Sequence, residues 1–312
     1  MAERVVEAEA RKLAAVEARP SVAVAWPRRL VRRNVGALFA EPKVTIGGGY
    51  IVALILVAVL AQWIAPKNPL DQDLMSASLP PMWLPGAEPG YLLGTDDLGR
   101  DVLSRLIYGS RVALIVAFVA AALAALLGSA LGLFAGWYSG WVDSAISRLV
   151  DIWMAFPPVL LSILLVAVLG AGVVSVIAAI AIIDWTRFCR VLRAETMAQA
   201  KSDYVIAARA VGFPPIRILM REILPNVLPA LLALVSLEMG IAVIVEAILS
   251  FVGLSVSSDT PTWGGMIAEG RQFIHQTWWV FAAPLAALFV TVLAFNQLGD
   301  GLRRALDPVL RR

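Results

Sequence analysis

Five apolar stretches, each long enough to cross a lipid bilayer, constrain this sequence more than any other feature. They are residues 44–65, 112–136, 152–183, 227–252 and 276–298, and only the fourth contains charged residues. A transmembrane helix needs about 20 mainly apolar residues. Hydrophobic residues make up 60% of the 312 and charged residues only 16%, well below the roughly 25% of an average soluble domain. The sequence therefore predicts an all-α integral membrane protein.

The third stretch is too long for one helix, and "GAG" at Gly170 to Gly172 divides it. We expect one helix from near Ser144 and another from Val173 to about Leu192, which makes six transmembrane helices. An even number of helices places both termini on one side. Lys and Arg are concentrated before residue 44 and between Arg187 and Arg221. Because loops rich in Lys and Arg stay in the cytoplasm, both termini are predicted to be cytoplasmic.

This topology divides the chain into five regions. We expect a cytoplasmic tail at 1–43, a first transmembrane helix at 44–65 and a periplasmic loop at 66–110. A core of five transmembrane helices follows at 111–300, with a cytoplasmic loop at 195–225, and a cytoplasmic tail at 301–312.

Several classes of function are not favoured by the composition. The chain has one cysteine, Cys189, and one histidine, His275, which leaves no cluster typical of a zinc site or a His-based relay. The net charge of +3 does not suggest a nucleic-acid partner. The first twenty residues lack the apolar core of a secretory signal. We expect no catalytic residue, no metal site and no directly bound cofactor.

Local patterns give further expectations within the helices. Gly128, Gly132 and Gly136 recur every four residues, a spacing that lets a neighbouring helix approach closely. Asp184 and Arg187 are three residues apart and can form an ion pair on one helix face. We expect Arg148 and Asp151 to pair in the same way.

The segment 93–114 carries an acidic set, Asp96, Asp97 and Asp101. Thr95 is a plausible N-cap for a helix that would hold Asp96 and Asp97 in its first turn, where carboxylates favour the helix dipole. The set lacks the loop pattern of an EF-hand, so a folded external turn is favoured over a calcium site.

The segment "SDYVIAARAVGFPP" interrupts the apolar pattern between the fourth and fifth predicted membrane helices. Ser202 or Asp203 can cap a short helix. Gly212 can end it in the left-handed conformation, and Pro214 stops it two residues later. A helix of this length is unstable alone. We therefore expect anchors at Tyr204, Val205 and Phe213, with Ala207 and Ala208 giving a smooth face for another protein. A capped interhelical connection with no partner is the simpler alternative.

Together with the following "ILPN", the string "DYVIAARAVG" resembles the cytoplasmic loop of binding-protein-dependent ABC importers. "LGTDDLGRDVLSRLIYGSRVAL", "FVGLSVSSDTPTWGGMI" and "LGDGLRRALDP" look like the C-type permease subunit of dipeptide, oligopeptide and nickel importers. The resemblance covers roughly residues 50–308. One departure is Glu222 after Arg221, where that subfamily usually has "RH" or similar.

The resemblance implies a type I ABC importer permease fold in the bacterial inner membrane. It implies a homologous B-type permease subunit as partner, two ATPase subunits that use ATP and Mg²⁺, and an extracytoplasmic solute-binding protein. The chain lacks the phosphate-binding loop G-x-x-x-x-G-K-[ST]. The residues implied for ATPase coupling are Asp203, Tyr204, Ala207, Ala208, Arg209, Gly212, Phe213, Pro214, Arg221 and Pro225.

Two questions stay open from the sequence. Glu238 and Glu246 lie within the fifth predicted membrane helix, where they could line the transport pathway or be hydrogen-bonded structural groups. Peptides are the expected substrate, and nickel chelates, glutathione or another small solute are alternatives. Two other functions remain: a self-contained proton-coupled transporter, with Asp184 and the two glutamates as its relay, and a membrane scaffold.

Overall fold

The computed structural model describes residues 40–255 and 260–306, and the expectations for the two terminal tails lie largely outside this range. Within the described residues the chain is helical and forms no strand. The α-helices are α3 (Pro42–Val59), α4 (Ala61–Ile64), α5 (Val102–Tyr138), α6 (Gly140–Met154), α7 (Pro158–Leu169), α8 (Val173–Gln199), α9 (Asp203–Ala210), α10 (Pro215–Ile218), α11 (Leu224–Phe251), α12 (Trp263–Gln272) and α13 (Trp278–Leu306).

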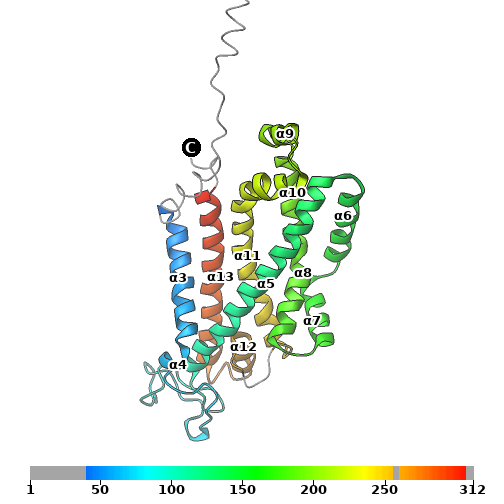
Figure 1. Ribbon diagram of the computed structural model, residues 1–312. Helices are drawn as coiled ribbons and strands as arrows, with labels where there is room; N and C mark the ends of the chain where they lie inside the picture. Colours follow the sequence, from blue (N-terminus) through cyan, green and yellow to red (C-terminus); the bar gives the residue numbers. More distant parts are fainter. Residues whose placement is uncertain (1–39, 256–259, 307–312) are drawn as a thin grey trace, which may run out of the picture.

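The long helices run between two ends of the molecule (Figure 1). We call them the α9 end and the loop end; the loop end carries α4, α12 and residues 65–101. The start of α3 and the end of α13 both lie toward the α9 end, where Lys43 and Asp300 form an ion pair at 2.9 Å. The described part of the chain therefore begins and ends on the side of α9.

The glycine spacing in α5 produces the close helix contact that it predicted. A Cβ atom at Gly132 would lie 2.6 Å from the carbonyl oxygen of Cys189, and one at Gly136 would lie 2.7 Å from that of Arg193. Gly128 faces the Trp185 carbonyl even more closely. The α5 and α8 backbones therefore touch along three successive turns, which only glycine permits.

The third predicted membrane helix is not one straight helix. It begins at Gly140 rather than near Ser144, and it is broken into α6 and α7, whose axes are bent by 86° relative to each other. Pro157 and Pro158 stand at the break. A proline lacks the N–H for the helix ladder and pushes the preceding residue out of the helical region, so the chain must turn here. The predicted turn at Gly170 to Gly172 is present between α7 and α8.

Length and composition identify four helices able to cross a membrane, or five if α6 and α7 count as one broken span. The four are Pro42–Val59, Val102–Tyr138, Pro215–Phe251 and Trp278–Leu306. The fourth predicted membrane helix, α8, carries Asp184, Arg187 and Arg190, and these charges keep it out of that set. Six membrane-crossing helices therefore remain a prediction.

Two local expectations are wrong. Thr95 does not cap a helix that contains Asp96 and Asp97; α5 begins later, and its N-cap is Asp101, whose carboxylate accepts the Ser104 N–H at 2.8 Å. Asp151 pairs with Arg190 of α8 at 2.9 Å instead of with Arg148. The cap of α5 is a local contact that lies six residues further along the chain than expected, whereas the partner of Asp151 comes from the packing of α6 beside α8.

Candidate coupling segment, buried carboxylates and loop-end network

The short helix α9 is closed at its C-terminus by a Schellman motif. Gly212 has φ +86°, in the left-handed region, as its position predicts. The Gly212 N–H donates to the Arg209 carbonyl at 2.9 Å, and the Phe213 N–H donates to the Ala208 carbonyl at 3.1 Å. Ser202 is the N-cap residue, although its side chain makes no cap hydrogen bond. Only the C-terminal end of α9 is therefore closed by specific hydrogen bonds of this kind.

One side of α9 is anchored to the helices beneath it. Val205 is fully buried in a hydrophobic cluster with Leu192 of α8, Leu133 of α5 and Ile218 of α10. Burying such a side chain stabilises the contact by about 1.5–3 kcal/mol. Tyr204, Ala208 and Phe213 pack against the same cluster. Ala208 thus belongs to the inner face of α9, whereas Ala207 is exposed.

A polar contact adds to this anchor. The Tyr204 hydroxyl donates to the Gln199 side chain at 2.6 Å, and the Asn226 amide donates to the Tyr204 oxygen at 3.3 Å. Burial raises the pKa of Tyr204, and the Asn226 hydrogen bond opposes this in part. The hydroxyl therefore ties the start of α9 to the end of α8 and to α11.

The opposite side of α9 is apolar, basic and exposed. Ile206 is 54% exposed and Val211 is 73% exposed. Arg209 lies at the border of this exposed side, because its guanidinium is 4.1 Å from the centre of the ring of Trp137, which packs against the inner cluster. Figure 1 shows α9 standing at the end of the molecule, beyond the ends of the long helices. Nothing within the described residues covers this outer face.

A groove continues this surface next to α9. It is a shallow, open depression of about 440 Å³ lined by Ile216, Arg217, Met220 and Arg221. The Arg217 guanidinium lies 4.1 Å from the centre of the Phe213 ring, which places its charge beside the Schellman motif. The exposed side of α9 and this groove form one apolar surface bordered by arginines; we call it the α9 surface.

A short turn, residues 211–214, joins the α9 helix to a long helix. Residues Pro215–Phe251 run as a single helix of α10, a π-helical turn at Leu219–Ile223 and α11. Pro225 follows the π turn; it has no N–H for the Arg221 carbonyl and its ring crowds that group, so the local widening has a clear cause. Displacement of α9 would therefore act on a continuous helix.

Glu238 lies in the interior, between α11 and α8. Its side chain is buried, and both its oxygens lack a hydrogen bond within the described residues. The Arg187 guanidinium lies 3.5 Å from Glu238 and 3.7 Å from Asp184. Asp184 and Arg187 thus form the predicted pair, and Glu238 joins it. Two buried carboxylates share one half-exposed arginine.

Glu246 lies two turns further along α11 and is also buried. Its Oε1 accepts hydrogen bonds from the Ser250 hydroxyl at 2.6 Å and the Ser255 hydroxyl at 3.2 Å. Such bonds offset part of the cost of burying a carboxylate. Neither glutamate faces the surface of this chain, and Glu246 is hydrogen-bonded within it; a pathway-lining role for either residue stays a prediction.

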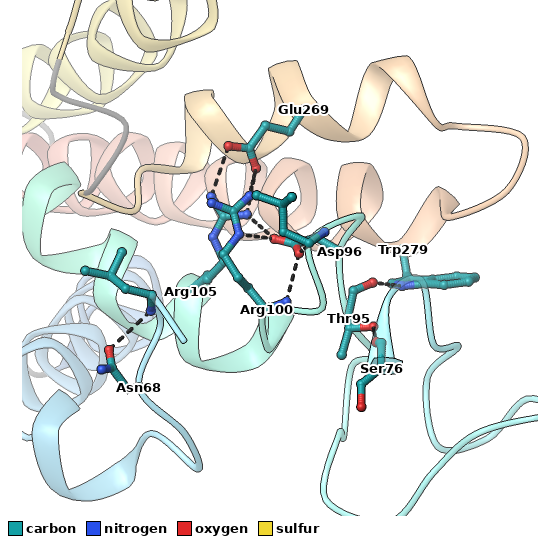
Figure 2. A network of polar contacts seen from close by, with 10 residues as sticks. Asn68, Ser76, Thr95, Asp96, Arg100, Arg105, Glu269 and Trp279 are labelled. Atoms are coloured by element: carbon teal, nitrogen blue, oxygen red, sulfur yellow. Dashed lines mark hydrogen bonds and ion pairs between the residues drawn. The ribbon is translucent and has the colours of Figure 1, made fainter. Parts of the chain in front are cut away.

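The loop end holds a network that the sequence pattern did not indicate (Figure 2). The Asp96 carboxylate is fully buried; it accepts Arg105 Nη1 at 2.5 Å and Arg100 Nε at 2.7 Å. Both arginines also reach Glu269 of α12, at 2.6 and 3.0 Å. We call these four residues the loop-end network. The four-residue spacing of Asp96 and Arg100 could have suggested one ion pair, but the contacts with Glu269 could not be predicted because Glu269 is remote in sequence.

Further bonds tie the same loop to the helices. The Trp279 indole N–H donates to the Thr95 carbonyl at 3.1 Å, and the Thr95 hydroxyl donates to the Ser76 carbonyl at 2.6 Å. The carboxylates of Asp96 and Asp101 accept hydrogen bonds from the protein itself, Asp96 from Arg100 and Arg105 and Asp101 from Ser104. Among the described residues no group of three or more acidic, His or Cys side chains is placed to hold a metal ion.

Comparisons with known proteins agree with this arrangement. Residues 128–312 match the family model described as the inner membrane component of binding-protein-dependent transport systems. Residues 31–81 match the N-terminal transmembrane domain of oligopeptide transport permease C. Among solved structures, a chain of the MetNI methionine ABC transporter, in an inward-facing conformation, is similar with a TM-score of 0.55 and 19% identity. That likeness covers 65% of this chain and 96% of the other, and it concerns the fold.

Three curated relatives are similar over most of their length. The dipeptide permease DppC of Escherichia coli is 43% identical, over 90% of this chain and 91% of its own. The di/tripeptide permease DppC of Pseudomonas aeruginosa is 39% identical, over 88% and 90%. The glutathione permease GsiD of Salmonella typhimurium is 40% identical, over 85% and 86%. The chain therefore belongs to the family of inner membrane components of binding-protein-dependent transport systems and is a multi-pass protein of the bacterial inner membrane.

Proposed function

We propose that this chain is the permease subunit of a peptide importer. In this proposal it forms the pathway for dipeptides or short oligopeptides together with a homologous permease. A solute-binding protein delivers the substrate from outside. The observation that carries the substrate class is the identity of 43% with a dipeptide permease over 90% of this chain. The identity of 40% with a glutathione permease supports glutathione, itself a small peptide, as the second candidate.

Both termini and α9 face the cytoplasm in this proposal. The described chain begins and ends on the side of α9, and most of the Lys and Arg residues lie in the segments assigned to that side, as the positive-inside rule expects. The broken pair of α6 and α7 and the charged helix α8 then complete six crossings. Charges on α8 are tolerated because Asp184 is buried against other helices.

The α9 surface is the proposed contact for an ATPase subunit. Val205, Tyr204 and Phe213 fix α9 to α5, α8 and α10, and the short link to Pro215–Phe251 transmits movement to a membrane helix. ATP and Mg²⁺ belong to the two partner ATPase chains, because this sequence lacks a phosphate-binding loop. A rigid, anchored helix passes on a displacement that a flexible loop would absorb.

Reconstitution tests the whole proposal. The chain, its homologous partner and the ATPase subunits are placed in liposomes, and ATP hydrolysis is measured with the solute-binding protein loaded with a dipeptide, loaded with glutathione or empty. We expect dipeptide to stimulate hydrolysis most. Stimulation by glutathione alone would move the substrate to the second candidate. Uptake by this chain alone, driven by a pH gradient, would establish the proton-coupled transporter instead.

A further inference from the structure

An apolar groove lies on the surface between α3 and α5, near the loop end. It is a shallow, open groove of about 600 Å³. Ile55 and Val59 of α3 form one wall, and Leu114, Ile115 and Phe118 of α5 form the other. Val59 is 61% exposed and Ile115 is 50% exposed. The groove therefore presents apolar side chains outward, between two helices that are long and apolar enough to cross a membrane.

Arg111 is the charged residue among those that line the groove. Its Nε donates to the Ala58 carbonyl at 2.6 Å, its Nη2 lies 3.4 Å from the Val59 carbonyl, and its guanidinium carbon lies 4.9 Å from the centre of the Tyr108 ring. These contacts fix the guanidinium at the end of α3. They use neutral groups only, so the positive charge has no anionic partner within the described residues.

Charge and apolar surface follow one another in a definite order along α5. Arg111 lies at the level where α3 ends, while Phe118 and Val119 lie about 12 Å deeper along α5, at 1.5 Å per residue. A cation at the membrane interface followed by an apolar groove toward the interior matches a phospholipid. Arginine binds phosphate through a planar fork of N–H donors, and an acyl chain extends directly from that headgroup into the hydrocarbon.

We propose that this groove is a phospholipid site, with the phosphate on Arg111 and one acyl chain between α3 and α5. A helix of the partner permease is the competing occupant. The charge favours the lipid, because an apolar helix would bury a guanidinium that has neutral partners only, away from any anion, which is costly within a membrane. The orientation given under the proposed function places the site in the outer leaflet; the site itself depends only on the groove and Arg111.

Photolabelling tests this site in the assembled transporter. The full-length chain and its partner subunits are reconstituted in vesicles of phosphatidylethanolamine and phosphatidylglycerol. These contain a trace of phosphatidylglycerol with a photoactivatable group on one acyl chain, and labelled peptides are identified by mass spectrometry. We expect labelling within 55–59 and 111–119. Arg111→Gln should reduce it about fivefold, the effect of one interfacial arginine. Arg271→Gln is the matched control, since that guanidinium lies over Phe251, away from the groove, and should change nothing.

A second variant separates lipid binding from any effect of Arg111 on folding. Ile115→Trp fills the groove and leaves Arg111 intact, so labelling should fall while the complex still elutes as one species. Labelling that both variants leave unchanged would overturn the site. Absence of label in the unaltered protein, with cross-links from Ile115→Cys to the partner permease, would overturn it in favour of a protein occupant. None of these results depends on transport or on the substrate.

Discussion

Across Gly212, the Phe213 backbone N–H donates to the Ala208 carbonyl at 3.1 Å, and this bond closes α9 beside its anchor. Ala208 and Phe213 also pack against the cluster around Val205. The same residues therefore define the end of the helix and hold it to the membrane helices. The coupling role proposed for α9 requires this combination of closure and anchoring.

Gly212→Val should uncouple ATP hydrolysis from transport while membrane insertion persists. The position has φ +86°, where a β-branched residue costs roughly 1–3 kcal/mol, so the end of α9 should loosen. The measurement is dipeptide-stimulated ATP hydrolysis and uptake in the reconstituted complex. Gly90→Val is a matched control, because Gly90 has φ +101° and open space around it but lies in the loop-end segment. Equal loss of coupling in both variants would speak against a special role for α9.

Gly128→Ala should lower the melting temperature of the protein. A Cβ atom there would collide with the Trp185 carbonyl of α8, and forcing a methyl group into a packed contact costs about 1–3 kcal/mol. Gly49→Ala is the control, since Gly49 lies in α3 with nothing within 4 Å of an added Cβ. Alanine favours helix by about 1 kcal/mol over glycine, so this variant should be neutral or stabilised. Thermal unfolding in detergent distinguishes the two.

Arg105→Met should destabilise the loop end more than Glu269→Gln does. Asp96 is fully buried, and Arg105 holds it at 2.5 Å; removing one partner of a buried pair costs about 3–5 kcal/mol. The Glu269 side chain is 36% exposed, and glutamine can still accept a hydrogen bond. Glu269→Gln should therefore lower the free energy of unfolding by only about 1 kcal/mol. Protease resistance of residues 65–101 reports the effect. A smaller effect for Arg105→Met than for Glu269→Gln would contradict this account of the network.

Tyr204 should make the attachment of α9 depend on pH in the alkaline range. Burial raises its pKa in the folded state, so the neutral hydroxyl favours the attached form. This contribution is complete below the ordinary tyrosine pKa of about 10 and is lost as pH rises through the higher folded value. The protection of α9 amides against hydrogen exchange, corrected for the base-catalysed rise of intrinsic exchange with pH, should fall in that range, and Tyr204→Phe should abolish this fall. An unchanged pH dependence in Tyr204→Phe would show that another group causes the effect.

The sequence predicted α9 well because its signals are local. Gly212 and Pro214 end the helix through their own backbone preferences, and the glycines at Gly170 and Gly172 form a turn for the same reason. Features that depend on packing were missed. The 86° bend at Pro157 and Pro158 needs a direction that local rules do not supply.

Long-range ion pairs were missed for a related reason. Asp151 finds Arg190 on α8 rather than Arg148 on its own helix, and Glu269 reaches Arg105 from a remote segment. The placement of a charged side chain depends on which helices pack together, and a single sequence shows this only where glycine spacing marks a contact, as between α5 and α8.

The outer face of α9 offers the most direct test of ATPase coupling. Val211→Cys places a thiol on this face, and the native Cys189 is buried. In the assembled transporter, a short bifunctional reagent should link position 211 to an ATPase subunit, whereas Met75→Cys at the loop end should give no such link. A thiol at position 211 that reacts freely with reagent and links to no ATPase, in a complex that still hydrolyses ATP in response to dipeptide, would contradict the account.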